Sequence, residues 1–319
     1  MADKQSCAFR TTIGGQALIE GILMRGPDKQ AIVVRSPEGL VIREEELKLI
    51  RDKYPILGLP LIRGSVTFLD SMVKGVKALM FSADFYPEEA GTEEPSKFEQ
   101  WLDRKLGNEK VEKLVIAFSV VVAVAFSVGL FMLLPTFLSS FVELWTDSVL
   151  LRNLVDALLR IGLFMGYLIL VSRMKDIRRV FSYHGAEHKT IFCYENGLEL
   201  TVENVRPQPK HHPRCGTSFL LVVIIVAILI NTIVFAIFPV GNVFLRMLIQ
   251  LLLLPLVVGI TYEINRWCGR NDNAFTRALS APGMWMQHFT TNEPDDSMIE
   301  VGIAAVQAVL PEKEGSDRW

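Results

Sequence analysis

The strongest constraint on this chain is a run of 29 consecutive residues without a charged side chain, from Leu114 to Val142. A helix needs about 20 apolar residues to cross a bilayer, so this run predicts a membrane-spanning helix. Residues 215–245 form a second uncharged run, of 31 residues, in which a turn around Pro239 is expected to end the helix. Residues 247–262 form a third run. Because backbone surrounded by lipid must satisfy its own hydrogen bonds, these runs predict an α-helical membrane protein.

A further span over residues 153–172 is less obvious, because Asp156 and Arg160 interrupt its apolar sequence. These two residues lie four apart, where opposite charges can pair on one face of a helix. The Lys and Arg pattern supports the span, since basic residues gather in 97–113, in 173–216 and after 265, while 143–152 and 239–246 hold one Arg each. Positively charged loops stay in the cytoplasm, so both termini are expected there. The four expected spans are 114–142, 153–172, 217–238 and 245–264.

Residues 1–83 predict a small cytoplasmic domain. Two β-rich runs flank the turn sequence Ser36–Gly39, which predicts a hairpin over 31–43. Gly14 and Gly15 are interpreted as turn residues, and 44–53 as a short polar helix. In 61–83 apolar residues recur at helical spacing, which predicts an amphipathic helix that either lies on the bilayer or packs on the hairpin.

The other segments outside the spans are polar. Residues 84–113 predict an acidic linker followed by a charged helix. Residues 265–319 predict a cytoplasmic tail, in which Ser297 and Glu300 fit a capping box before an amphipathic helix that packs on the N-terminal domain. The expected fold class is an α-helical integral membrane protein with about four transmembrane helices and a small mixed α+β cytoplasmic domain.

Composition narrows the classes of partner. The net charge of −2 gives no sign of nucleic-acid binding. The four cysteines are scattered without a CxxC pair, which favours metal ligands or core residues, such as Cys193, over a disulfide framework. The first residues lack the apolar segment of a signal peptide. The expected partner is the lipid bilayer, with other membrane or membrane-associated proteins as further candidates.

Four of the five histidines fall within residues 173–216, the expected cytoplasmic loop. His184-Gly185-Ala186-Glu187-His188 matches the H-x-x-E-H pattern of inverted zinc metalloproteases. Residues four apart share a helix face, so His184 and His188 can bind one metal ion, with Glu187 as general base. The alternative is that the two histidines only cap or pack. His211 is interpreted as a solvated neighbour.

Three residues are candidates to complete the metal site. His212 and Cys215 lie three residues apart at the start of a span, and imidazole with thiolate suits zinc. Glu263 lies at the cytoplasmic end of the last span, where a carboxylate either binds the metal or pairs with Arg266 or Arg214. The expected cofactor is a divalent metal, zinc.

Several motifs have a family resemblance: Gly14–Pro27, Tyr183–Lys189, His212–Thr217, Tyr262–Glu263, Pro282–Gly283 and Thr290–Pro294. They resemble the YqhQ-like family of bacterial integral membrane proteins, which are uncharacterised and described as predicted metal-dependent enzymes. The resemblance covers nearly the whole chain and implies a multi-pass protein of the bacterial cytoplasmic (inner) membrane. The family pattern has a basic residue at position 288, so His288 is not counted among the ligands.

The leading hypothesis is therefore a metal-dependent hydrolase at the cytoplasmic membrane face, acting for instance on an amide or peptide bond. The alternative is a non-enzymatic scaffold, assembly factor or transport component whose polar or metal cluster is structural. Transport calls for ionisable residues deep in the spans, whereas those of this chain lie toward the span ends.

Overall fold

The computed structural model describes residues 8–48, 50, 54–86, 108–146, 148–271, 273–313 and 315–318. The chain divides into two compact units, each described by itself below. The first comprises Met1–Tyr86, Tyr167–Ile230 and Leu253–Trp319, and the second comprises Pro87–Gly166 and Asn231–Leu252.

The first unit holds a four-stranded antiparallel sheet, in the order β1 (Gly14–Leu18), β2 (Gly21–Arg25), β3 (Lys29–Ser36) and β4 (Gly39–Glu46). The β3–β4 pair is the predicted hairpin, closed where Ser36 pairs with Gly39. Residues 44–46 were expected to begin a helix but belong to β4, because Glu44, Glu45 and Glu46 pair with β3. Ladder hydrogen bonds here outweigh the helical preference of glutamate.

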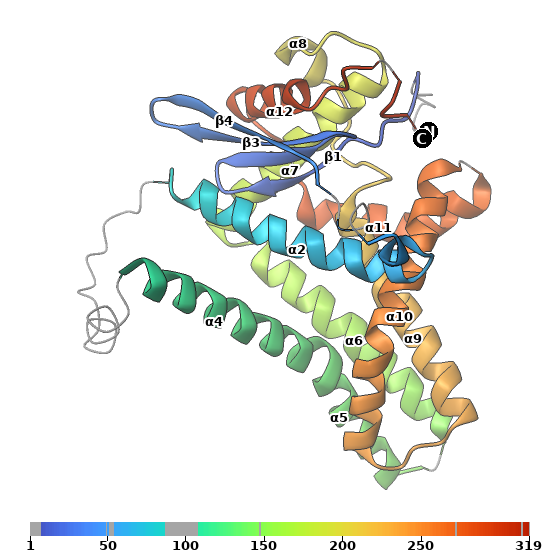
Figure 1. Ribbon diagram of the computed structural model, residues 1–319. Helices are drawn as coiled ribbons and strands as arrows, with labels where there is room; N and C mark the ends of the chain where they lie inside the picture. Colours follow the sequence, from blue (N-terminus) through green and yellow to red (C-terminus); the bar gives the residue numbers. More distant parts are fainter. Residues whose placement is uncertain are drawn as a thin grey trace. The chain divides into compact units, whose positions relative to one another are not determined.

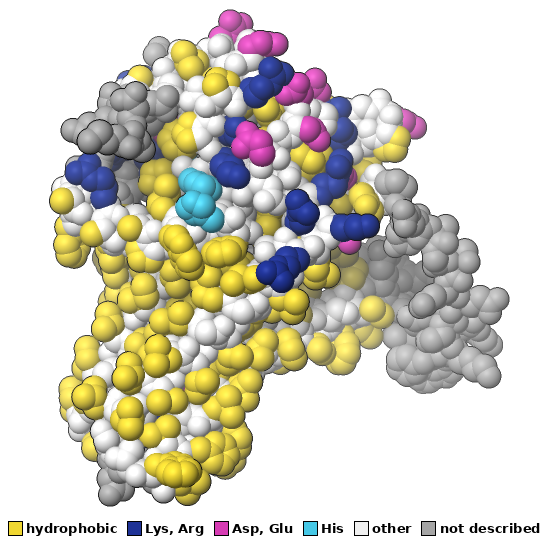
Figure 2. All heavy atoms as spheres, turned by 180° about the vertical axis from the view of Figure 1, so that it is seen from behind, with side chains coloured by type: hydrophobic (Ala, Val, Ile, Leu, Met, Phe, Trp, Pro, Cys, Tyr) yellow, Lys and Arg dark blue, Asp and Glu magenta, His cyan; other side chains and the backbone are white. Residues whose placement is uncertain are grey.

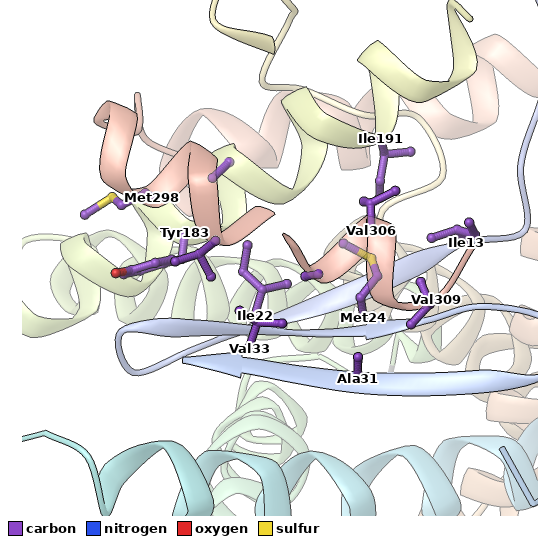
Figure 3. Close-up of a cluster of buried hydrophobic side chains, with 13 residues drawn as sticks. Ile13, Ile22, Met24, Ala31, Val33, Tyr183, Ile191, Met298, Val306 and Val309 are labelled. Atoms are coloured by element: carbon purple, nitrogen blue, oxygen red, sulfur yellow. The ribbon is translucent and has the colours of Figure 1, made fainter. Parts of the chain in front are cut away.

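One face of the sheet packs on α7 (Lys175–Glu195) and α12 (Asp296–Ala308) (Figure 1). Side chains of alternate strand residues meet those of the two helices in a buried core, as Figure 3 shows for Ile22, Met24, Val33, Tyr183 and Val306. The predicted packing of the C-terminal amphipathic helix on the N-terminal domain is confirmed.

The other face of the sheet packs on α2 (Ile62–Ala83). Leu18, Leu23, Ile32 and Val34 form a buried hydrophobic cluster with Ala78 of this helix. The amphipathic helix predicted over 61–83 is confirmed, and packing on the strands, one of its two predicted alternatives, is what the structure shows. Because both faces of the sheet are covered, β2 and the middle of β3 are buried almost without alternation.

Helix α12 begins two residues earlier than a Ser297 cap would give. Asp295 is the N-cap, and its Oδ1 accepts a hydrogen bond from the Met298 amide at 3.0 Å. The predicted capping box on Ser297 and Glu300 is therefore wrong, because Asp295 already accepts from the first turn and Ser297 donates to Asp295 at 2.6 Å. The remaining elements of the first unit include η1 (Pro55–Gly58), α8 (Val202–Val205) and α11 (Ala274–Thr290), the last without a sequence prediction.

Four helical segments are long and apolar enough to cross a membrane: Leu114–Ser140, Val149–Val171, Gly216–Ile237 and Val243–Arg270. The first segment is formed by α4 (Asn108–Val128), η2 (Gly129–Leu133) and α5 (Leu134–Ser140), and η3 (Phe141–Leu144) follows it. The other three segments are α6 (Val149–Val171), α9 (Gly216–Ile237) and α10 (Val243–Arg270). The four segments match the four predicted spans in number and approximate position. Hydrophobic side chains cover the surface of the apolar helices on the face drawn in Figure 2. The predicted linker and charged helix over 84–113 lie mostly outside the described residues, and from Asn108 the chain is helical.

The second unit buries a polar network among its apolar helices. The predicted pairing of Asp156 with Arg160 is confirmed, with Arg160 Nε 2.7 Å from Asp156 Oδ2. Thr136 donates to the other oxygen of Asp156 at 3.0 Å, and Arg160 Nη2 donates to Gln250 Oε1 at 3.1 Å. Arg246 hydrogen-bonds Asn153. Asp156, Arg160 and Arg246 are thus each paired or hydrogen-bonded, as burial of a charge requires.

Candidate metal centre

The candidate site is built on α7, a helix inside the segment predicted as the loop 173–216. Residues 183–191 of this helix are all buried, because the sheet and α12 cover one side and the segment after α11 covers another. Gly185 allows the second contact, since a Cβ at this position would overlap the carbonyl oxygen of Asn292. A glycine that weakens the helix locally therefore serves close packing.

Three of the predicted ligands converge. The ligand atoms of His184, His188 and Cys215 all lie within 4.8 Å of one another, and all three residues are buried. His184 Nε2 is 3.0 Å from Cys215 Sγ, and the two imidazole centroids are 4.3 Å apart. The helical spacing of the two histidines places them on one face, and Cys215, just before α9, meets them there.

The outer nitrogen of each imidazole is held by a backbone carbonyl. His184 Nδ1 is 2.8 Å from the oxygen of Thr290, and His188 Nδ1 is 2.6 Å from the oxygen of Lys210. A carbonyl only accepts, so both Nδ1 atoms carry a proton, and either ring in its neutral form presents its lone pair at Nε2. Metal-binding histidines are oriented in this way by their surroundings.

One imidazole nitrogen of this group has no hydrogen-bond partner. His188 Nε2 is buried and unsatisfied among the described residues. A buried acceptor left without a donor is costly, and a cation bound between His188, His184 and Cys215 would satisfy it. The residues present therefore fit a metal ion.

The electrostatics of the cluster favour a thiolate. Burial alone would raise the pKa of Cys215, but the charges of His184 and His188 lower this pKa well below its usual value. Burial alone would lower the pKa of His184, but the Cys215 thiolate raises it to about 9. The backbone amide of Thr217 also donates to Cys215 Sγ, at 3.4 Å. A thiolate is the form of cysteine that binds metals.

Glu187 lies beside the three-residue group rather than in it. Its Oε1 accepts a hydrogen bond from the Gly15 amide at 2.9 Å, and its Oε2 is buried without a partner among the described residues. Burial raises the pKa of Glu187, and the charges of His184 and His188 oppose this shift. One carboxylate oxygen is thus oriented by the backbone while the other has no partner in the protein.

Gly14 and Gly15 lie in β1, which corrects their interpretation as turn residues. A Cβ at Gly15 would come within 2.7 Å of the Leu23 carbonyl oxygen and 3.0 Å of Glu187 Cδ, whereas a Cβ at Gly14 would meet nothing within 4 Å. Gly15 therefore permits the close approach of β1 to the Glu187 carboxylate.

The structure does not bring the other two predicted ligands into the group. The ring of His212 lies next to that of His188, with centroids 5.7 Å apart, but its Nε2 is 3.4 Å from Glu195 Oε2. Burial lowers the pKa of His212 to about 4, although Glu195 opposes the shift. Glu263 pairs with Arg63, whose Nε donates to it at 2.7 Å, rather than with Arg266 or Arg214.

A cavity of about 590 Å³ reaches this site. Its lining includes Glu187, His188 and Cys215, the two glycines Gly14 and Gly15, and residues of α2. A small molecule inside the cavity would therefore contact both the cluster and the carboxylate.

Comparison with known proteins identifies the family. A model described as "Protein of unknown function (DUF1385)" matches residues 59–312. A relative, "Uncharacterized protein YqhQ" of Bacillus subtilis (strain 168), is 32% identical over 302 residues, which cover 93% of this chain and 92% of that protein. The chain belongs to the DUF1385 family. The YqhQ-like resemblance of the motifs is thereby confirmed, and no solved structure matches.

The DUF1385 match contains the whole His184–His188–Cys215 group. It also contains Glu195, a residue near the site that was not predicted from the sequence. Glu195 is fully buried at the end of α7, where it accepts from the Thr11 amide at 2.9 Å and pairs with Arg214. Its position seven residues after His188 puts it on the same helix face, a signal the sequence does contain.

Proposed function

We propose that this member of the DUF1385 family is a metal-dependent hydrolase at the cytoplasmic face of a bacterial inner membrane. His184, His188 and Cys215 would hold a zinc-like ion, and Glu187 would act as general base. The observation that carries the proposal is the convergence of two carbonyl-tethered imidazoles and a cysteine, three ligand atoms within 4.8 Å, at the wall of a cavity.

The donor set suits a catalytic ion. Nitrogen and sulfur donors favour zinc among the common divalent metals. Catalytic zinc sites use three protein ligands and leave a fourth position open, whereas structural sites are closed by four. When bound, zinc lowers the pKa of a coordinated water to about 7 and polarises a carbonyl.

Glu187 would accept a proton from water and later return it to the leaving group. Its Oε2 would accept a proton from the attacking water while the Gly15 amide holds Oε1 in place. The water oxygen bonds to the carbonyl carbon of the substrate, the bond to the leaving nitrogen or oxygen breaks, and Glu187 returns the proton to that leaving atom. Burial that raises the pKa of Glu187 makes its carboxylate a stronger base.

The membrane placement is part of the proposal. The four apolar helices and the Lys/Arg distribution support four spans with both termini cytoplasmic, and the basic segment that contains α7 would then face the cytoplasm. The bilayer is the expected partner.

The first experiment measures metal. Protein purified without chelator and incubated with zinc is expected to hold about one ion per chain by elemental analysis. The variant His184→Ala/His188→Ala is expected to lose it, whereas His288→Ala, which changes an exposed histidine outside the group, is expected to keep it. A wild type that binds no zinc contradicts the proposal.

The second experiment separates catalysis from a structural role. Glu187→Gln keeps the shape and removes the basicity, so it is expected to retain zinc yet fail to complement a deletion strain. Glu203→Gln, an exposed change on α8, is the matched control and is expected to complement. Full complementation by Glu187→Gln at normal protein level would refute the hydrolase.

A structural metal site is the competing function, because Cys215 and α7 belong to separate segments that an ion would tie together. It predicts that Glu187→Gln is nearly silent, while His184→Ala lowers thermal stability and complementation together. A non-enzymatic scaffold, assembly factor or transport component would show this second pattern.

A further inference from the structure

The cavity beside the cluster is lined by two kinds of side chain. Glu187, His188 and Cys215 are polar, while much of the remaining lining is apolar and includes Leu23, Leu57 and Val66. Its volume of about 590 Å³ is in the range of small-molecule sites. Such a division suits a molecule with a reactive polar group and an apolar chain.

Arg25 differs from the other arginines that line this cavity in the side chain that it binds. Arg63 pairs with Glu263, and Arg214 pairs with Glu195. Arg25 instead donates from Nη1 to the Ser71 hydroxyl at 3.0 Å.

The carboxylate that acts on the pKa of Arg25 already has another partner. Burial lowers this pKa and the charge of Asp70 opposes the shift, but Asp70 forms its ion pair with Lys74, at 2.8 Å. Within the part of the cavity lining that the structure describes, Arg25 thus offers a guanidinium without a carboxylate of its own. Guanidinium groups bind carboxylates and phosphates through paired hydrogen bonds.

The α2 wall of the cavity is tied to a candidate span. A Cβ at Gly64 would come within 2.7 Å of Tyr262 Cβ and 2.9 Å of Gly259 Cα, so these glycines let α2 and α10 touch. The Ser65 hydroxyl donates to the Pro255 carbonyl at 2.8 Å. Helix α2 therefore starts against a part of α10 that lies within the proposed span.

The outer face of α2 is apolar. Leu69 and Val73 are 60% and 56% exposed, and Ile62 is exposed as well. A helix packed on a span by one face and apolar on another lies naturally at the membrane interface. The lining residues Val66 and Ser71 belong to this same helix, so in the proposed topology the cavity would lie next to the bilayer surface.

We propose that this cavity binds an anionic amphiphile from the bilayer, with its anionic group on Arg25 and its apolar chain along Leu23, Leu57 and Val66. The proposal rests on the proposed function where it names the substrate class, since the bond to be cleaved would lie near Glu187 and Cys215. The binding itself requires no catalysis. The anion is a carboxylate or a phosphate, because a guanidinium accepts both.

The test is saturable binding of tritiated palmitate to the purified full chain in dodecyl maltoside. Excess dodecyl phosphate is expected to compete if the site takes phosphate as well as carboxylate, and its competition relative to unlabelled palmitate ranks the two anions. Dodecyltrimethylammonium, acetate and inorganic phosphate are expected not to compete, because each lacks the anion or the chain.

Two variants examine the two ends of the ligand. Arg25→Gln is expected to weaken palmitate binding by about tenfold or more, the effect of removing a charge-assisted hydrogen bond. Gly14→Leu is expected to block binding by filling the cavity, and it should fold because its Cβ meets nothing within 4 Å. Arg43→Gln, an exposed change on β4, is the control and should bind as wild type.

Wild-type binding by both Arg25→Gln and Gly14→Leu, or equal competition by dodecyltrimethylammonium or acetate, would overturn the proposal. Zinc content, measured on the same samples, shows that the variants keep the cluster. It also separates two failures, because a wild type without zinc refutes the hydrolase, whereas zinc-loaded protein without palmitate binding refutes only the amphiphile.

Discussion

Neighbouring glycines in β1 differ in what they permit. Gly15→Ala is expected to destabilise the protein, because its Cβ would press on the Leu23 carbonyl and on Glu187. Overpacking of this kind costs about 1–3 kcal/mol. Gly14→Ala is the control and should be nearly neutral, since its Cβ enters open space. Thermal melting of both purified variants measures the difference, and equal melting temperatures would show that the contact is not tight.

Some of the individual site residues could be predicted from the sequence. His184, Glu187 and His188 could be grouped because they lie on one helix, and Cys215 because a residue at the start of the next span can face back to that helix. Glu263 could not be placed, because its partner Arg63 is 200 residues away and no periodicity connects them.

The role of Gly15 could not be predicted from the sequence either. In the sequence, a glycine needed for a turn cannot be distinguished from one needed for close contact with a carboxylate. Only the packing of β1 on α7 shows which of the two applies to Gly15.

Among the elements, α12 provides a test of which residue caps it. Asp295→Ala is expected to cost about 0.5–2 kcal/mol, because the Met298 amide loses its acceptor. Ser297→Ala should cost less, since Ser297 only donates to Asp295. Thermal melting of the two variants at pH 7 decides it, and a larger effect at Ser297 would restore the capping box predicted from the sequence.

The contribution of Asp295 should also depend on pH. Burial alone would raise the pKa of Asp295, but hydrogen bonds from Ser297 and Met298 lower it below its usual value. A lowered pKa means that this stabilisation is full above the unfolded value of about 3.9 and disappears as the pH falls through the folded value. The melting difference between wild type and Asp295→Ala should therefore be constant from pH 7 to 5 and shrink toward pH 3. An unchanged difference at pH 3 would contradict the assignment.

Elements with a clear period were predictable, and those that tertiary contacts support were not. The spans, α2 and the β3–β4 hairpin follow from hydrophobic patterns and turn residues. The β1–β2 turn was hidden because Glu20, at a φ of 50°, holds a conformation that usually calls for glycine. Arg179 and the Tyr183 hydroxyl bind the Glu20 carboxylate there.

Helix α11 was hidden in a similar way. Pro282 and Gly283 in its interior are poor helix formers. A Cβ at Gly283 would come within 2.5 Å of Ser218 Cβ, so this glycine serves the contact with α9. Part of the Pro282–Gly283 motif thus reflects packing.

For the whole molecule, the topology is the prediction on which the site's location depends. A reporter fused after Leu198 should behave as cytoplasmic, because basic residues surround α7, and one fused after Thr146 as external. Paired alkaline phosphatase and green fluorescent protein fusions measure both positions. An external Leu198 fusion would place the candidate metal centre on the wrong side of the membrane for the proposed function.

The buried network of the second unit gathers residues from helices far apart in the chain, and it tests whether charge pairing holds those helices together. Asp156→Leu leaves Arg160 without its ion pair, and an uncompensated arginine inside a membrane costs about 2.5–3.5 kcal/mol. The double variant Asp156→Leu/Arg160→Met removes both charges and should recover much of the lost stability, because apolar replacements of a buried pair are often neutral. Thermal melting in detergent, with the exposed Leu158→Ala on the same helix as control, measures both effects. If the double variant is less stable than Asp156→Leu alone, the hydrogen bonds of Arg160 to Thr136 and Gln250, rather than its pairing with Asp156, hold these helices together.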